Sequence, residues 1–245
     1  MAGLDEVGRG AWAGPVTVGV AVLNPEVRTG SMPRWLRDSK LLAEERRESV
    51  FGEVARWCAD GAVGHASAAE CDRWGMTVAL RLAAFRALAA LELAPEAILI
   101  DGPYDLLREP GPRQGAGSAD DEPGGWGVEV VELPLDLGAT AESAGDGALL
   151  PPMPEVRVPP TVLPVVDGDA KCAAVAAASV LAKVTRDRLM REESPHFPPY
   201  DFEQNKGYPS PAHKIALRGY GLSAIHRRSW AFVDDLPWGG LRYRR

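Results

Sequence analysis

The chain has 245 residues, 46% of them hydrophobic and 25% charged, which is ordinary for a globular protein and sufficient for a substantial core. Its apolar stretches fall short of the roughly 18 residues that a membrane span needs, and the N-terminus lacks the basic region of a signal peptide. The three cysteines, Cys58, Cys71 and Cys172, lack metal-ligand spacing and favour a reducing compartment. We therefore predict a cytoplasmic protein with no membrane partner.

The net charge of −7 is unevenly distributed along the chain. Residues 105–160 hold eleven acidic and three basic side chains, whereas residues 183–245 hold twelve basic and seven acidic ones. A basic C-terminal region suits a polyanionic partner such as nucleic acid, although such a region is often no more than a solvated surface.

The periodicity of apolar residues predicts strands that alternate with helices. After a glycine-rich turn, residues 16–23 are typical of a buried strand, and short apolar runs at 63–69, 97–100 and 161–166 indicate further strands. Helices are expected at 41–59, 76–93, 171–191 and 211–218, with a last ordered segment at 226–233. This order predicts an α/β fold in which helices flank a mixed sheet.

Residues 103–160 differ in composition from the rest of the chain. Twenty of the sixty residues from 101 to 160 are Gly or Pro, a fraction above the roughly 25–30% that is typical of low-complexity chain. Most of this stretch cannot bury enough apolar surface to offset its ordering entropy, and a hairpin strand at 128–133 is the one element we expect in it. We predict a largely disordered acidic insertion in a domain over 1–193, followed by a helical region over 194–245.

Four acidic side chains stand at predicted strand ends or strand-to-helix turns. Asp5 and Glu6 are adjacent, and because successive strand residues point to opposite faces, both can line one site only where the strand ends. Asp101 follows the strand at 97–100, and Asp169 follows the strand at 161–166. A solvated turn at Asp5 and Glu6, a turn former at Asp101 and a helix N-cap at Asp169 are the structural alternatives.

Several blocks of the sequence resemble, in order, those of the ribonuclease HII family. They cover nearly all of the chain except 103–160: LDEVGRGAWAGPV at 4–16, DSK at 38–40, DG at 101–102, GD at 168–169 with AAVAAASVLAKVTRDRLM at 173–190, NKGYP at 205–209 and HRRSW at 226–230. The resemblance implies the ribonuclease H-like fold with a helical C-terminal subdomain. It also implies cleavage of RNA in RNA/DNA hybrids and on the 5′ side of ribonucleotides in duplex DNA, giving 3′-hydroxyl and 5′-phosphate ends.

The resemblance also implies that Asp5, Glu6, Asp101 and Asp169 are catalytic and bind metal. Carboxylates that converge raise one another's pKa unless cations neutralise them, and hard Mg²⁺ or Mn²⁺ ions suit oxygen ligands. Two ions about 4 Å apart would activate water and stabilise the leaving oxygen. Asp167, where the family commonly has a basic residue, is expected to be solvated.

Two further sites would recognise the substrate: the first is expected from the exposed main chain of the glycine-rich turn beside the acids, and the second is implied by the resemblance. Gly8-Arg9-Gly10 would grip the ribose 2′-hydroxyl, and Tyr208 would stack at the RNA-to-DNA junction. A tight hairpin turn and a core tyrosine are the alternatives. Candidates for phosphate contacts, each alone more typical of a surface charge, are Lys40, Lys183, Arg186, Lys206, Arg227 and Arg228. Asp187 is expected to pair with its helix neighbours instead of a metal.

We therefore predict a monomer whose partners are RNA/DNA hybrids and ribonucleotide-containing duplex DNA. Two other functions stay open: a nuclease of the same fold that acts on DNA, and a hybrid-binding protein that has lost activity. Cleavage of a duplex containing one ribonucleotide separates all three.

Overall fold

The computed structural model describes residues 1–23, 33, 36, 43–108 and 150–237. They form a five-stranded mixed sheet in the order β3-β2-β1-β4-β5. The strands β1 (Ala2–Val7), β2 (Val16–Val22) and β3 (Asp60–Ala66) are antiparallel neighbours. On the other side of β1, β4 (Ala97–Asp101) and β5 (Thr161–Val165) run parallel to it. The predicted α/β class is confirmed.

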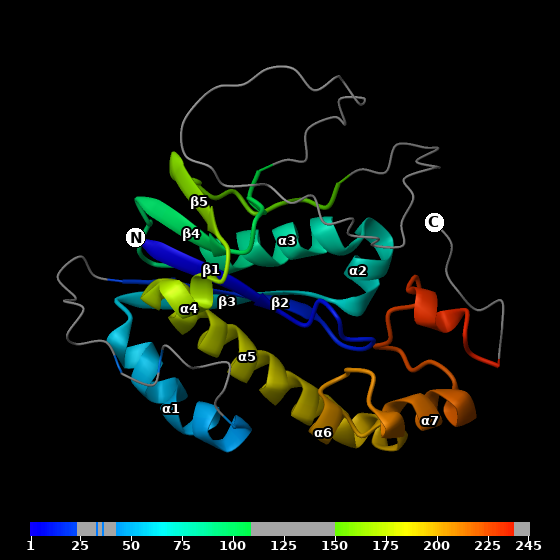
Figure 1. Ribbon diagram of the computed structural model, residues 1–245. Coiled ribbons are helices and arrows are strands. Elements are labelled where there is room, and N and C mark those ends of the chain that lie inside the picture. The colour runs from blue at the N-terminus through cyan, green and yellow to red at the C-terminus, as the bar shows by residue number, and fades with distance from the viewer. Residues whose placement is uncertain (24–32, 34–35, 37–42, 109–149, 238–245) are drawn as a thin grey trace, which may run out of the picture.

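Helices cover both faces of this sheet (Figure 1). On one face lie α2 (Ala68–Trp74) and α3 (Met76–Ala89), and on the other lie α1 (Glu44–Trp57), α4 (Gly168–Lys171) and α5 (Ala173–Glu193). The remaining helices are η3 (Ser194–His196), η4 (Pro198–Tyr200), α6 (Phe202–Asn205), α7 (Pro211–Tyr220) and η5 (Ala231–Val233). Among the described helices, none is long and apolar enough to cross a lipid bilayer.

Local signals explain where the elements differ from the prediction. The helix expected at 171–191 is two helices, because Cys172 is extended, with φ −123° and ψ 118°. The strand expected at 63–69 is shifted to Asp60–Ala66, and Ser67 instead caps α2, a helix that was not predicted. Ser67 and Glu70 form a reciprocal capping box, which satisfies two main-chain N–H groups at the start of that helix. The segment 128–133 lies outside the described residues.

Two glycines let α5 contact the sheet through its backbone. A Cβ added to Gly3 would lie 2.2 Å from the carbonyl carbon of Ala174, and one added to Gly19 would lie 2.4 Å from the carbonyl oxygen of Ala178. The opposite face of β1 and β2 carries larger side chains, such as Leu4 and Val18, which pack with α3 in the main core. Over β1 and β2, the helix backbone therefore lies closer to the sheet on the α5 side than on the α3 side.

The C-terminal region adds a core of its own beside the end of α5. Met190 of α5 packs there with Tyr200, Phe202, Leu217 and Phe232, all of them buried. Between 194 and 237 the chain carries the short helices η3 to η5, and its loops bind the main chain of the β1–β2 turn through Gly207 and Ile225 (Figure 1).

Gly19→Ala tests the close approach of α5. The new methyl would overlap main-chain atoms of α5, and we expect a loss of about 1–3 kcal/mol in the free energy of unfolding, as for overpacking. Urea unfolding measures it. The matched control is Gly219→Ala in α7, where an added Cβ meets nothing within 4 Å and helix propensity favours Ala. Equal losses at both positions would contradict this account.

Candidate active site

A cavity of about 270 Å³ opens between the sheet and α5, at the carboxyl ends of β1 and β4. Three acidic side chains line it together with two basic ones and three smaller or apolar neighbours. The lining residues are Asp5, Glu6, Val7, Arg47, Asp101, Ser179, Val180 and Lys183. Carboxylates from two strands thus face cations from α1 and α5.

Strand register brings the acids together. β1 and β4 are parallel with Leu4 opposite Ile100, so Asp5 and Asp101 are the next residues of neighbouring strands. Asp5 pairs with Gly19 on the antiparallel side and therefore shares the face that α5 covers. Glu6 reaches the same cavity because β1 ends one residue later, so both acids line one cavity at a strand end.

Main-chain donors and one arginine hold these carboxylates. Asp5, only 4% exposed, accepts a hydrogen bond from the Glu6 amide at 2.8 Å. Asp101 accepts one from the Gly168 amide at 2.7 Å, which ties β4 to the start of α4. Glu6 pairs with Arg9 at 3.0 Å. The acids therefore stand in fixed positions around the cavity.

Asp169 lies beside this group but does not line the cavity. It is buried in the first turn of α4, directly after the Gly168 amide that binds Asp101. The N-cap position belongs to Asp167, which is exposed and 3.8 Å from Lys171, as expected of a solvated residue. Across the described part of the chain, no three His, Cys, Asp or Glu side chains are close enough to hold a metal. Direct convergence of all four acids stays a prediction.

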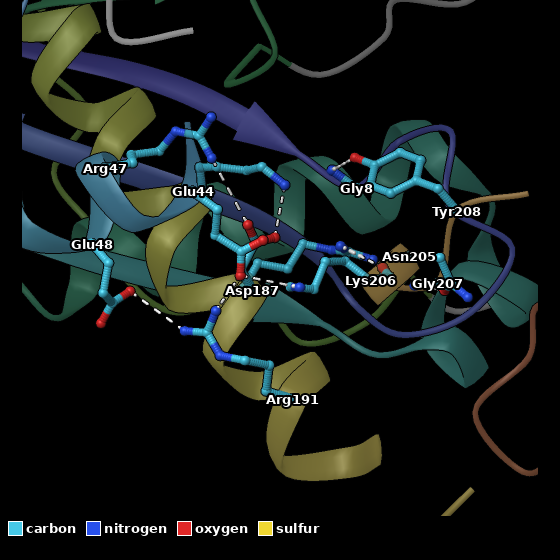
Figure 2. Close-up of polar contacts among 12 residues, drawn as sticks. Gly8, Glu44, Arg47, Glu48, Asp187, Arg191, Asn205, Lys206, Gly207 and Tyr208 are labelled. Carbon is cyan, nitrogen blue, oxygen red and sulfur yellow. Dashed lines mark hydrogen bonds and ion pairs between the residues drawn. The ribbon is translucent and has the colours of Figure 1, made fainter. Parts of the chain in front are cut away.

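The two cations of the cavity share one carboxylate. Asp187 lies 2.7 Å from the Lys183 ammonium and 4.0 Å from the Arg47 guanidinium (Figure 2). The predicted pairing of Asp187 with a helix neighbour is confirmed. Burial lowers the pKa of Lys183, and Asp187 acts in the opposite direction.

The two segments expected to recognise ribose meet beside the acids. Gly8 has φ +89°, and its amide donates a hydrogen bond to the Tyr208 hydroxyl at 3.2 Å (Figure 2). The amides of Trp12 and Ala13 bind the Gly207 carbonyl at 2.8 and 3.2 Å. Residues 200 positions apart are thereby fixed next to each other at the end of β1.

Comparison with known proteins decides the family. The family model "Ribonuclease HII" matches residues 2–111 and 152–233. The chain belongs to the ribonuclease HII family. It is 41% identical over 245 residues to a ribonuclease HII of Streptomyces avermitilis, covering 99% of this chain and 82% of the relative. It is 40% identical to one of Thermus thermophilus, covering 97% and 89%. The resemblance is confirmed, and the chain is an endoribonuclease of the hydrolase class.

Solved structures agree on the fold. The ribonuclease H2 of Pyrococcus horikoshii matches with a TM-score of 0.62 at 26% identity, covering 96% of this chain and 95% of that one. A structure described as the PCNA:RNase HII complex from Archaeoglobus fulgidus matches with the same score at 22% identity, covering 100% and 97%. Bst-RNase HIII in complex with Mn²⁺ matches with 0.59 at 18%, covering 95% and 67%. The ribonuclease H-like fold is confirmed.

Two arginines that were expected to contact phosphate are buried instead. Arg186 and Arg227 are both 0% exposed. Arg186 donates to the carbonyls of Pro15 and Lys206 at 2.9 Å and of Ala13 at 3.2 Å. Because neither guanidinium reaches the surface, the prediction for both was wrong. Sequence shows that a residue is charged but not that it is buried.

Arg227 binds main-chain carbonyls of the same turn after β1. Its guanidinium donates to the carbonyls of Arg9 at 3.0 Å and of Gly14 at 3.2 and 3.3 Å. Burial lowers its pKa to about 10, which still leaves it cationic at neutral pH. Two buried cations therefore hold the chain between Arg9 and Pro15, which includes part of the Gly-Arg-Gly segment, by its carbonyl oxygens.

Lys206 is a structural residue as well. It is 4% exposed and left-handed, with φ 50°, and its ammonium contacts the Glu203 carbonyl and lies 3.1 Å from Glu44 of α1 (Figure 2). The ammonium of Lys206 is thus bound within the protein, which does not favour the predicted contact with the substrate. Arg228 is exposed, and Lys40 lies outside the described residues.

Two buried histidines went unpredicted as functional residues. His213 and His226 are 0% and 1% exposed, and their Nε2 atoms lie 2.8 Å apart. Burial lowers the pKa of both histidines. For His226, the neighbouring His213 and Arg228 act in the same direction, and together these effects bring its pKa to about 3. In sequence, a polar residue in an apolar neighbourhood gives no sign of such a partner.

The stability of the protein should fall below about pH 6.5, the ordinary histidine pKa. Below that pH the unfolded chain binds protons that the folded histidines do not, so His226 costs up to about 1.4 kcal/mol of stability per pH unit as the pH falls toward 3. His213 contributes in the same direction. Urea unfolding at pH 7, 6 and 5 measures this loss. His226→Gln removes one such group and should give a shallower slope from a lower starting stability. Parallel slopes would contradict the burial of a neutral pair.

Proposed function

We propose that the protein is a metal-dependent endoribonuclease that cuts RNA in RNA/DNA hybrids and on the 5′ side of ribonucleotides in duplex DNA. The products would carry 3′-hydroxyl and 5′-phosphate ends. The observation that carries the proposal is the cavity that Asp5, Glu6 and Asp101 line beside the Gly8–Tyr208 contact. Phosphodiester hydrolysis and ribose recognition would then take place next to each other, in a chain of the matching family.

The donor set fits hard divalent cations. Asp5, Glu6 and Asp101 offer only oxygen ligands, and Asp169 is held next to them through Gly168; such ligands suit Mg²⁺ or Mn²⁺. When two such ions are bound, they activate the attacking water and stabilise the leaving oxygen. Asp5 is almost fully buried, and the cost of burying a carboxylate charge is offset when the carboxylate coordinates a metal.

Selectivity for RNA would come from the end of β1. Gly8 is buried, with its amide bound to Tyr208, whereas Gly10 is exposed in the turn after Glu6, where its main-chain groups would bind a 2′-hydroxyl. The Tyr208 ring, whose hydroxyl binds the Gly8 amide, would stack on the sugar or base at the junction. Lys183 lines the cavity and would approach a phosphate there. The protein would act as a monomer on hybrids and ribonucleotide-containing duplexes.

Asp101→Asn tests the metal assignment. An end-labelled duplex with one ribonucleotide is incubated with enzyme in Mg²⁺ or Mn²⁺. Loss of one carboxylate ligand should lower the cleavage rate by about 100-fold or more, because stabilisation of several kcal/mol is removed, while hybrid binding persists. Asp167→Asn, at an exposed acid beside α4, is the control and should cleave normally.

The outcomes separate the alternatives. Normal turnover by Asp101→Asn would overturn the metal site. Failure of the unmodified protein in both metals would favour an inactive hybrid-binding protein. Cleavage of a duplex without ribonucleotides at a similar rate would favour a nuclease that acts on DNA.

Tyr208→Ala should reduce the preference for a single ribonucleotide over a long hybrid by about tenfold, since a base stacked on an aromatic ring is worth about 1–3 kcal/mol. The ratio of kcat/KM values on the two substrates measures it. Tyr220→Ala, at a tyrosine that is 71% exposed on α7, should leave the ratio unchanged. An unchanged ratio in Tyr208→Ala would remove that residue from the recognition site.

A further inference from the structure

Tyr208 stands at one end of a hydrogen-bond chain that runs through the C-terminal core. Its carbonyl oxygen lies 2.9 Å from Nδ1 of His213, whose Nε2 lies 2.8 Å from Nε2 of His226. Nδ1 of His226 in turn accepts the Ser223 amide at 2.9 Å and contacts the Ser223 hydroxyl at 2.7 Å. The chain thus joins α7, the segment before it and the 223–226 turn.

The hydrogen-bond partners at the two ends determine which ring nitrogen of each histidine carries a proton. A carbonyl oxygen only accepts, so His213 carries its proton on Nδ1 and offers Nε2 as an acceptor. A main-chain amide only donates, so Nδ1 of His226 is bare and its proton is on Nε2. These two assignments, reached from opposite ends, give one N–H···N bond in the middle. Both rings are therefore neutral, since a second proton on either would oppose a donor.

The surroundings favour the neutral pair. The rings of Tyr200 and Phe202 pack against both histidines, and Trp12 packs against His213. Arg228 is the charged residue that disfavours a proton on His226, and no carboxylate among the described residues contacts either ring through a hydrogen bond or ion pair. The two histidines are therefore an uncharged pair whose hydrogen bonds all run in one direction, from Ser223 through His226 and His213 to the Tyr208 carbonyl.

The carbonyl that His213 binds is one of three in a row that are held by separate donors. Arg186 binds the Lys206 carbonyl, the amides of Trp12 and Ala13 bind that of Gly207, and His213 with the Ser210 amide binds that of Tyr208. Lys206 and Gly207 are left-handed, with φ 50° and 84°. Such a backbone is held in place by its surroundings, and the last peptide of the three sets the direction in which the Tyr208 side chain leaves the chain.

We propose that the His213–His226 pair is a positioning device for Tyr208, which fixes the tautomer of His213 and thereby the place of the tyrosine ring against Gly8. This rests on the proposed role of Tyr208 in recognising the ribonucleotide junction. Neither histidine touches the substrate. Ser223 orients His226, His226 orients His213, and the Nδ1–H of His213 holds the Tyr208 peptide.

Two substitutions of similar size separate positioning from core packing. In His213→Asn the side-chain amide nitrogen takes about the place of Nδ1 and still donates to the Tyr208 carbonyl. In His213→Gln the amide reaches the place of Nε2, which keeps a partner for His226 but leaves the carbonyl without its donor. Both variants lose ring contacts, so both should unfold at lower urea concentration.

The preference for a single ribonucleotide over a long hybrid is measured as the ratio of kcat/KM values, where both variants are folded. His213→Asn should keep the ratio within about twofold, whereas His213→Gln should lower it by about threefold or more, as for one hydrogen bond of ordinary strength. Equal ratios in the two variants, whether kept or lost, would overturn the positioning role.

Two further results distinguish a failure of the positioning role from a failure of the proposed role of Tyr208. A lower ratio in Tyr208→Ala with a normal ratio in His213→Gln overturns the inference alone, whereas a normal ratio in Tyr208→Ala overturns the assigned role of Tyr208 itself. Nitrogen-15 spectra of the unmodified protein test the proton assignment without any substrate. They should show His213 protonated on Nδ1, His226 protonated on Nε2, and both rings neutral at pH 6; the reverse tautomers would overturn the proposal.

Discussion

The direct contact of α5 with β1 and β2 is the constraint on which the site depends. With glycine at positions 3 and 19, the helix backbone lies against the strands where side chains would otherwise separate them. Asp5 lies on the same strand face as these glycines, and it is covered by a helix that carries Ser179, Val180 and Lys183. The cavity thus lies between helix and sheet and is lined by three carboxylates and two cations. A thicker layer between helix and sheet would leave the same acids open to water and without a shared site.

Two buried guanidinium groups, those of Arg186 and Arg227, hold the loops around this cavity. A guanidinium taken out of water is costly unless its donors are satisfied, and here the acceptors are carbonyls of segments far apart in the chain. Arg186 and Arg227 each bind two or more carbonyls, so each substitutes for several main-chain contacts that a turn cannot make by itself. The Gly8–Tyr208 contact joins the segments whose carbonyls, at Arg9 and Lys206, these arginines bind. Recognition of ribose would therefore depend on arginines that never meet the substrate.

Sequence patterns predicted the sheet, its main helices and the acids at the strand ends. Those features follow from local periodicity and from one rule of strand geometry, which made Asp5, Glu6 and Asp101 predictable as a group. The roles of Arg186, Arg227 and Lys206 were not predictable, because a basic residue in a basic region gives no sign of whether solvent or carbonyls surround it. Whether a basic side chain is buried depends on packing between distant segments, such as the 171 and 218 positions that separate Arg186 from Pro15 and Arg227 from Arg9. A single sequence does not show which distant segments pack together.

The same limit applies to histidine. His213 and His226 lie in or near sequence blocks of the family, yet neither block shows that one ring serves the other. The break at Cys172 was missed for a related reason: the small residues that follow it favour a helix throughout, and the turn that places Asp169 beside Asp101 is imposed by the Gly168 amide bond. Tertiary contacts overrode local propensity between α4, which carries Asp169, and α5.

The charges in the cavity explain why substrate and metal would bind together in the proposed function. Three carboxylates line the cavity, and its two cations are already shared with Asp187. A phosphate that approaches this group meets net negative charge, which opposes binding most strongly where the groups are buried. Divalent ions held by the carboxylates would reverse that sign, and a bound phosphate would in turn add oxygen ligands to them. By linkage, each would then raise the affinity of the protein for the other, so a protein with a net charge of −7 can still select a polyanionic substrate.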